Sequence, residues 1–299
     1  MIANTNDGST AEPRLRSYLN LLALDGLQAG TPARPDFEAI RAGGYEGVQF
    51  IDPVTDEQSA ACRRLGLHMA SSGRINEPHE ATLLAERFAG EGVECGTLHL
   101  GWGLEDKTAA RRLIEAVLAV SERYRVPLYV ETHRATLFQD MWRTVEFVRS
   151  FPELRFNGDF SHWYTGQEMV YGGFERKLAF LAPVLERVRF IHGRIGNPGS
   201  IQVDIGDGDA ARYPYVAHFR QMWTAAFTGF LATALPGDFV CFTPELLAPG
   251  IYYARVFPDA AGCLREESDR WEQSLLLRRI AQECFEAARI QRAPRNTAA

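Results

Sequence analysis

Residues 126–163 read VPLYVETHRATLFQDMWRTVEFVRSFPELRFNGDFSHW, and this stretch contains one complete structural unit and the start of the next. Residues 127–131 form an apolar run that ends in a carboxylate, and residues 138–151 are amphipathic. Residues 154–159 form a second apolar run that ends in another carboxylate, 28 residues after the first. A strand, a crossover helix and two loops need roughly 30 residues. The stretch therefore predicts two neighbouring parallel strands joined by a helix.

The same strand-then-helix unit repeats along the chain. Apolar runs that predict strands stand at residues 17–23, 47–51, 68–71, 97–100, 127–131, 154–159, 188–192 and 239–245. Amphipathic stretches that predict helices stand at residues 37–42, 57–65, 80–90, 108–124, 138–151, 173–188, 216–232 and 268–288. A doubly wound open sheet alternates in the same way. Eight units in a chain of 299 residues favour a single (β/α)8 TIM barrel of the α/β class.

No linker divides the chain into two domains. We expect one barrel at residues 14–290, a disordered N-terminal segment at residues 1–13 and a C-terminal tail at residues 291–299. A long stretch rich in Gly, Pro and Asp, residues 193–214, follows the seventh predicted strand. Because loops after barrel strands carry active sites, we expect it to lie at the barrel mouth, with a disordered insertion as the alternative.

The composition is that of a globular protein. The chain has a formal net charge of −6, with 46% hydrophobic and 23% charged residues, which excludes wholesale disorder and a fibrous protein. No apolar run reaches about 18 residues, and the polar N-terminus does not read as a secretory signal. The five cysteines are scattered without a CxxC pair, which suits a reducing compartment. We therefore expect a cytoplasmic protein with no membrane or nucleic-acid partner.

Four consecutive predicted strands end in an ionisable side chain: Glu131 in VPLYVETHR, Asp159 in LRFNGDFSHW, His192 in VRFIHGRIG and Glu245 in FVCFTPELL. All four would converge at the barrel mouth. Three crowded carboxylates repel one another and raise their pKa values unless a cation neutralises them. We therefore predict one divalent metal ion in this cluster, and Mn²⁺, Mg²⁺, Co²⁺ and Zn²⁺ all suit the ligand set. A helix cap or a rim salt bridge is the alternative for each residue taken alone.

Four short motifs carry a resemblance to a known family: VET with Glu131, GDFSH with Asp159 and His162, IHGR with His192 and Arg194, and PEL with Glu245. The sequence resembles the xylose-isomerase-like TIM-barrel superfamily, which includes sugar isomerases, D-tagatose epimerase, inosose dehydratase, hydroxypyruvate isomerase and endonuclease IV. The resemblance implies that the four strand-end residues hold the metal. It also implies that His162 and Arg194 bind substrate oxygens, although Arg194 is closer to His192 than the epimerase arginine is to its histidine. Glu131 and Glu245 would then act as base and acid around a metal-stabilised enediolate.

Other residues are weaker candidates for substrate contacts. His99 lies near the end of the fourth predicted strand, and Trp102 follows it. A structural histidine and aromatic packing are the respective alternatives, and Trp163 has the same two interpretations as Trp102. Gln202 and Asp204 in the long loop are candidates to close over substrate.

Together these features predict a divalent-metal-dependent sugar isomerase or epimerase that moves a proton on a small carbohydrate or polyol. A lyase on the same scaffold, either an inosose-type dehydratase or a C-glycoside-cleaving enzyme, is the main alternative. An endonuclease IV-like repair enzyme and a non-catalytic barrel are less favoured. Schiff-base chemistry is disfavoured because neither Lys107 nor Lys177 stands at a strand end. The apolar segment at residues 251–262 is suited either to docking on a partner chain, which makes a homodimer a further expectation, or to covering the barrel rim.

Overall fold

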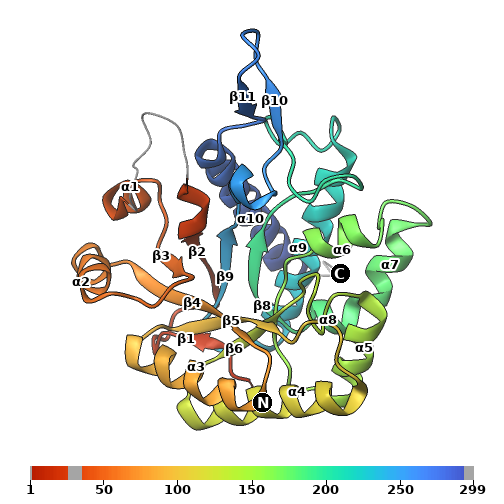
Figure 1. The fold of residues 1–299 in the computed structure, drawn as a ribbon. Helices are drawn as coiled ribbons and strands as arrows, with labels where there is room; N and C mark the ends of the chain where they lie inside the picture. Colours follow the sequence, from red (N-terminus) through yellow and green to blue (C-terminus); the bar gives the residue numbers. More distant parts are fainter. Residues whose placement is uncertain (1, 26–35, 293–299) are drawn as a thin grey trace, which may run out of the picture.

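The computed structural model describes residues 2–25 and 36–292, and in these residues parallel strands close into a barrel (Figure 1). The barrel strands are β2 (Arg14–Asn20), β3 (Gly47–Phe50), β4 (His68–Ile75), β5 (Cys95–Leu100), β6 (Leu128–Glu131), β7 (Phe156–Asn157), β8 (Val188–Gly193) and β9 (Asp238–Pro244). Each strand pairs in parallel with the next, and β9 pairs in parallel with β2. The predicted (β/α)8 TIM barrel is confirmed.

Helices alternate with the strands and cover the outside of the barrel, as Figure 1 shows. They are α1 (Phe37–Ala42), α2 (Asp56–Leu65), α3 (Pro78–Glu91), α4 (Lys107–Tyr124), α5 (Met141–Ser150), α6 (Ser161–Gly166), α7 (Phe174–Phe180), α8 (Ala182–Leu185), α9 (Pro214–Thr233) and α10 (Arg270–Arg292). Local sequence sets their ends. Thr55 and Gln58 form a capping box at the start of α2, and Gly66 ends that helix with a φ of 64°.

Most residues of the barrel strands are buried because one face packs inside the barrel and the other packs against the helices. Every residue of β3, β6, β8 and β9 is buried. Strand β7 is only two residues long, and its register with β8 shifts between Phe156 and Asn157. This irregularity lies directly before Asp159, at the same end of the barrel as the other predicted ligands.

The N-terminal segment differs from the sequence-based expectation of disorder over residues 1–13. Within residues 2–13, strand β1 (Thr5–Asn6) pairs antiparallel with β9, and Ile2 is 2% exposed. The Thr5 hydroxyl also lies 2.7 Å from the Tyr129 hydroxyl. A polar sequence can be ordered when its polar groups find partners, and here β9 and Tyr129 supply partners for Thr5 and Asn6. Of the expected tail, residues 291–292 complete α10 and residues 293–299 lie outside the described residues.

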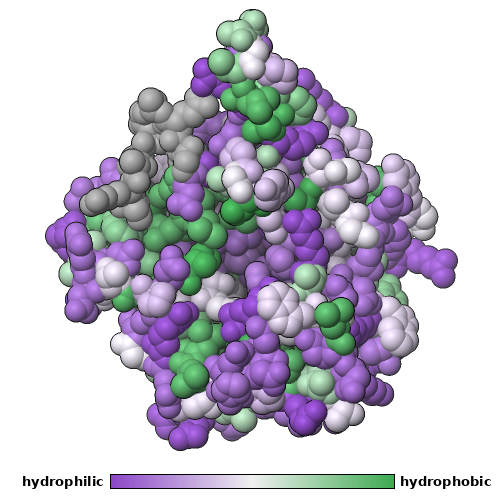
Figure 2. All heavy atoms as spheres, in the orientation of Figure 1, coloured by the Kyte–Doolittle hydropathy of each residue, from purple (hydrophilic) through white to green (hydrophobic). Residues whose placement is uncertain are grey.

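Two excursions rise above the mouth. The loop after β8 contains no disordered insertion in its described residues, and Gln202 anchors it by exchanging two hydrogen bonds with the backbone of Leu247, at 3.1 and 2.9 Å. After β9, the turn η2 (Pro249–Ile251) leads into a projecting hairpin of β10 (Val256–Pro258) and β11 (Leu264–Glu266), on which Figure 2 shows apolar side chains. The expected homodimer through this region stays a prediction.

Within residues 2–25 and 36–292, no helix combines the length and the apolarity that crossing a membrane requires. The cytoplasmic location stays a prediction.

Candidate functional site

The four predicted metal ligands converge at the barrel mouth. Glu131 ends β6, Asp159 follows β7, His192 lies in β8 and Glu245 follows β9. One ligand atom from each lies within 4.8 Å of those from the other three, and all four side chains are buried. The strand-end pattern in the sequence therefore identified a true spatial cluster. The catalytic and ligand roles assigned to its members stay predictions.

Buried amides hold the imidazole of His192. Its Nε2 lies 3.0 Å from Oε1 of Gln49, and the Gln49 amide nitrogen donates to Thr97 Oγ1 at 2.8 Å. This bond makes Gln49 Oε1 the acceptor and His192 Nε2 the donor. The other ring nitrogen, Nδ1, faces Glu131 at 3.3 Å and Glu245 at 3.5 Å. The ring thus presents Nδ1 to the carboxylates, in the orientation that a metal-binding histidine needs.

Two asparagines position the flanking carboxylates. Asn157 Nδ2 donates to Glu131 Oε2 at 3.0 Å, and its carbonyl oxygen accepts the backbone N–H of His192 at 3.1 Å. Asn20 Nδ2 donates to Glu245 Oε1 at 3.0 Å. Gln49, Asn20 and Asn157 have no exposed surface. Sequence reasoning missed all three, because a neutral amide inside a strand resembles any other polar interruption.

Asp159 is held from both sides. The backbone N–H of Ser161 donates to Asp159 Oδ1 at 3.1 Å, and Arg194 forms an ion pair with Oδ2. His162 Nε2 lies 3.4 Å from the same oxygen. Burial alone would raise the pKa of Asp159, but Arg194 and His162 hold it below its usual value.

The other three predicted ligands also have shifted pKa values, because buried carboxylates and imidazoles lie close together. Burial raises the pKa of Glu245, and the nearby cations offset this only in part. For Glu131, His192 and His99 outweigh burial and hold the pKa well below its usual range. Burial opposes the charging of His192, but Glu245 and Glu131 raise its pKa to about 9. A divalent cation would replace the proton that His192 carries between these carboxylates.

The residues fit a divalent cation by their chemistry. Glu131 is 1% exposed, and its Oε1 has no hydrogen-bond partner in the described part of the chain. An ionised oxygen buried without a partner is costly unless something else binds it. Three carboxylates and one imidazole form the donor set of a hard or borderline divalent ion. The cluster can therefore hold such an ion, and the choice among the four metals stays open.

A row of imidazoles borders this cluster on one side. The ring centroids of His99 and His133 are 4.1 Å apart, and those of His133 and His162 are 3.8 Å apart. Burial and the charge of His162 lower the pKa of His133 to about 2. Tyr253, from the segment after β9, places its hydroxyl 3.4 Å from His133 Nε2. The sequence alone assigns no role to His133 or Tyr253. The motif ETHR could have indicated His133 as a site residue, since it stands two residues after Glu131.

His99, Glu131 and His133 also bring ligand atoms within 4.8 Å of one another. Hydrogen bonds argue against a second metal there. Arg74 donates toward His99 Nδ1 at 3.2 Å, which leaves the ring proton on Nε2. That nitrogen lies 3.4 Å from Glu131 Oε1 without making a hydrogen bond to it. Because His99 Nε2 carries the proton in this arrangement, it offers no lone pair to a metal.

The remaining sequence candidates fall into different places. Trp102 is 52% exposed at the mouth, with Arg74 over its ring at 4.2 Å. Trp163 has no exposed surface, and its indole N–H donates to Phe138 O at 2.9 Å, so it is packed in the core and does not face substrate. Both the amide nitrogen and the amide oxygen of Gln202 bond the backbone of Leu247, as described above. Asp204 is half-buried and accepts from Gly206 N at 2.8 Å within its own loop.

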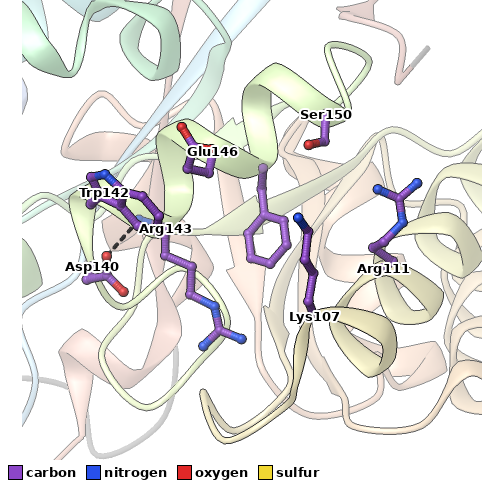
Figure 3. Close-up of a pocket in the computed structure, with 8 residues that line it drawn as sticks. Lys107, Arg111, Asp140, Trp142, Arg143, Glu146 and Ser150 are labelled. Atoms are coloured by element: carbon purple, nitrogen blue, oxygen red, sulfur yellow. Dashed lines mark hydrogen bonds between the residues drawn. The ribbon is translucent and has the colours of Figure 1, made fainter.

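A separate pocket of about 440 Å³ lies on the outside of the barrel between α4 and α5 (Figure 3). Lys107, Arg111, Arg143 and Trp142 are among its lining residues. Asp140 caps α5 by accepting the Arg143 backbone N–H at 2.7 Å. The described residues that line this pocket include none of the metal-cluster residues, so it is distinct from the mouth.

Comparison with solved structures shows what this chain is similar to. A D-tagatose 3-epimerase-like protein has a TM-score of 0.54 at 11% identity, over 92% of this chain and 99% of that one. A xylose isomerase domain protein from Planctomyces limnophilus has a TM-score of 0.54 at 15% identity, over 93% and 99%. A xylose isomerase-like TIM barrel protein from Mycobacterium smegmatis, in complex with magnesium, has a TM-score of 0.53 at 14% identity, over 91% and 97%.

No protein-family model and no curated protein sequence matches the chain. The structural likeness at these identities establishes the fold. The chain shares the TIM-barrel fold of these xylose isomerase-like and D-tagatose 3-epimerase-like structures, so the resemblance indicated by its four motifs is confirmed at the level of the fold.

Proposed function

We propose that this protein is a divalent-metal-dependent isomerase or epimerase that acts on a small carbohydrate or polyol. One observation carries the proposal: three carboxylates and an imidazole are buried together at the barrel mouth, and one Glu131 oxygen has no partner within the described residues. A protein with the same fold was solved in complex with magnesium, which supports a divalent cation as the cofactor. A small substrate also agrees with the net charge of −6, which disfavours binding to nucleic acid.

A divalent cation in the cluster would supply Lewis-acid stabilisation for negative charge that develops on a substrate carbonyl oxygen. The chain itself supplies the proton transfers. Glu131 Oε1 accepts no hydrogen bond within the described residues, which supports Glu131 as the base that takes a proton from carbon. Glu245 comes from a strand on the other side of the cluster, where Asn20 and Arg194 hold its two oxygens. This position supports Glu245 as the acid that returns a proton from the opposite side.

The surroundings of the cluster suit a molecule rich in hydroxyl groups. His99, His133 and Tyr253 present ring nitrogens and a phenol at the mouth, and Trp102 presents a partly exposed aromatic face. Such side chains bind sugars through hydrogen bonds and through stacking on C–H faces. His162 Nδ1 is buried without a hydrogen-bond partner in the described residues. Because the His162 side chain has no exposed surface, a substrate hydroxyl would reach this nitrogen only after a rearrangement of the mouth.

The test is isotope exchange in D₂O. Protein loaded in turn with Mn²⁺, Mg²⁺, Co²⁺ or Zn²⁺ is incubated with a panel of ketoses, and the sugars are examined by NMR and mass spectrometry. Deuterium on the carbon next to the carbonyl, without loss of water, supports isomerisation or epimerisation. Release of water or of an aglycone would support the lyase instead.

Isosteric variants test the two carboxylates. Glu131→Gln and Glu245→Gln should each lower exchange by about 10²–10⁴-fold, the usual contribution of a general acid or base. Glu115→Gln, an exposed position on α4, is the matched control and should exchange like the parent. If both active-site variants match the parent on every accepted substrate, the acid and base roles are refuted.

A further inference from the structure

Arg194 lies deeper in the protein than a substrate-binding residue needs to. Its side chain has no exposed surface. Nε donates to Ser161 Oγ at 3.1 Å, and one terminal nitrogen donates to the backbone oxygen of Glu245 at 3.1 Å. The other terminal nitrogen forms ion pairs with Asp159 and, at 3.1 Å, with Glu245 Oε2. Each nitrogen of the guanidinium is thus already engaged by the protein.

The positive charge of Arg194 lies between two carboxylates of the cluster. Glu131, Asp159 and Glu245 bring three carboxylates into a space that admits little water. The buried amides around them are neutral, and the imidazole of His192 faces Glu131 and Glu245, at 3.3 and 3.5 Å. Arg194 is therefore the one permanently charged cation that contacts these carboxylates within residues 2–25 and 36–292. It bridges two of them, Asp159 and Glu245, which come from different strands.

We propose that Arg194 is an internal counter-ion: a positioning residue that holds Asp159 and Glu245 together while no divalent cation is bound. This inference rests on the metal centre of the proposed function. A bound cation neutralises the same carboxylates and repels the guanidinium. The contribution of Arg194 to stability is consequently larger in the metal-free protein than in the metal-loaded protein. A residue that only packs, or only contacts substrate, would contribute equally to both.

The inference has a direct thermodynamic consequence. If loss of the guanidinium costs the metal-free protein more than the metal-loaded one, the thermodynamic cycle requires tighter metal binding by the variant. Arg194→Gln should therefore be less stable without metal and bind metal more tightly, by roughly tenfold, or about 1.4 kcal/mol. Arg194→Lys keeps the charge and loses part of the contact geometry, so its metal affinity should stay near that of the wild type.

A second buried arginine provides the matched control. Arg270 is 2% exposed, its Nε donates to Glu266 at 2.8 Å and one terminal nitrogen donates to Ala23 O at 2.6 Å. It resembles Arg194 in burial and in pairing, but its carboxylate partner is not part of the metal cluster. Arg270→Gln should lower the unfolding temperature by the same amount with and without metal.

The experiment uses the full chain. Unfolding temperatures of the wild type and the variants Arg194→Gln, Arg194→Lys and Arg270→Gln are measured in EDTA and in excess Mn²⁺, and Mn²⁺ dissociation constants are measured by calorimetry. The expected result is a larger Mn²⁺-induced shift and a lower dissociation constant for Arg194→Gln alone.

Equal shifts in Arg194→Gln and the wild type would overturn the counter-ion role. So would an Arg194→Gln variant that fails to fold even when expressed and purified in excess Mn²⁺, because a bound cation should replace much of the missing charge. A variant that folds only with Mn²⁺ would support it strongly. If the wild type shows no shift with Mn²⁺, Mg²⁺, Co²⁺ or Zn²⁺, the metal centre itself is refuted, and both proposals fall together.

Discussion

Replacing Gln49 by methionine tests whether the buried amides hold the metal ligands in place. Gln49 lies in β3 and has no exposed surface. Its side chain contacts three buried partners: Asn20 Nδ2 at 3.0 Å, Thr97 Oγ1 at 2.8 Å and His192 Nε2 at 3.0 Å. Methionine fills a similar volume and restores none of these bonds. The variant therefore isolates the hydrogen bonds from the packing.

The magnitude follows from the number of partners left behind. A buried polar group that loses its hydrogen bond costs about 1–3 kcal/mol. With three such groups, the variant should lose at least about 3 kcal/mol of unfolding free energy, which is roughly 6–12 °C in unfolding temperature for a protein of this size class. Removing the outer partner of a metal-binding histidine weakens metal affinity by about 10–100-fold.

The assay is thermal unfolding without metal, together with calorimetric titration of Mn²⁺. Thr97→Val is the matched control: it removes only the 2.8 Å bond between Thr97 and Gln49 and leaves the contact with His192 in place. It should cost about 1 kcal/mol and change metal affinity little. A Gln49→Met variant that binds Mn²⁺ as tightly as the wild type would refute the argument that Gln49 orients His192.

Three further predictions concern the frame of the barrel. Burial raises the pKa of Glu94, but hydrogen bonds and the charge of Arg16 outweigh burial and hold the pKa below 4.5. The stability that ionised Glu94 gives the folded protein is therefore complete above that pH and is lost as the pH falls through the folded-state pKa. Glu94→Gln should therefore flatten the acid limb of a urea-unfolding series, and an unchanged limb would contradict this. Gly193→Ala should cost about 1–3 kcal/mol or more in unfolding free energy, because the added Cβ would lie 2.2 Å from Phe242 Cζ; an unchanged unfolding temperature would show that the strand shifts freely. Ile2→Ala should cost about 2–5 kcal/mol in denaturant unfolding, whereas a disordered N-terminal segment would leave stability unaltered.

Much of the site could be predicted because it depends on strand ends. Glu131, Asp159, His192 and Glu245 each close an apolar run, and the parallel strands of a barrel bring such ends to one place whatever the intervening helices contain. The spacing of the runs predicted repeated βα units, since each unit needs a nearly constant length of chain, and the count of eight units favoured a barrel over a doubly wound sheet. These predictions required no knowledge of any side-chain contact.

The amides and the aromatic residues could not be predicted in this way. Gln49 and Asn157 lie within β3 and β7, where one neutral polar residue carries no signal of what it faces. Tyr253 reaches His133 across 120 residues of chain, and no local pattern encodes that contact. The order of the N-terminal segment likewise depends on β9, whose edge accepts β1.

Arg194 is the clearest example of a residue whose position in the sequence could be read directly but whose contacts depend on the tertiary structure. The sequence alone determined that a barrel would form, that four ionisable side chains would gather at its mouth, and that an arginine would stand two residues after His192. Only the tertiary structure decided that this arginine turns inward and bridges Asp159 and Glu245, with no exposed surface left for substrate. The reason is electrostatic: the cost of burying several carboxylates arises only once folding brings distant strands together and removes water, so no local stretch of sequence can reveal which cation will balance them.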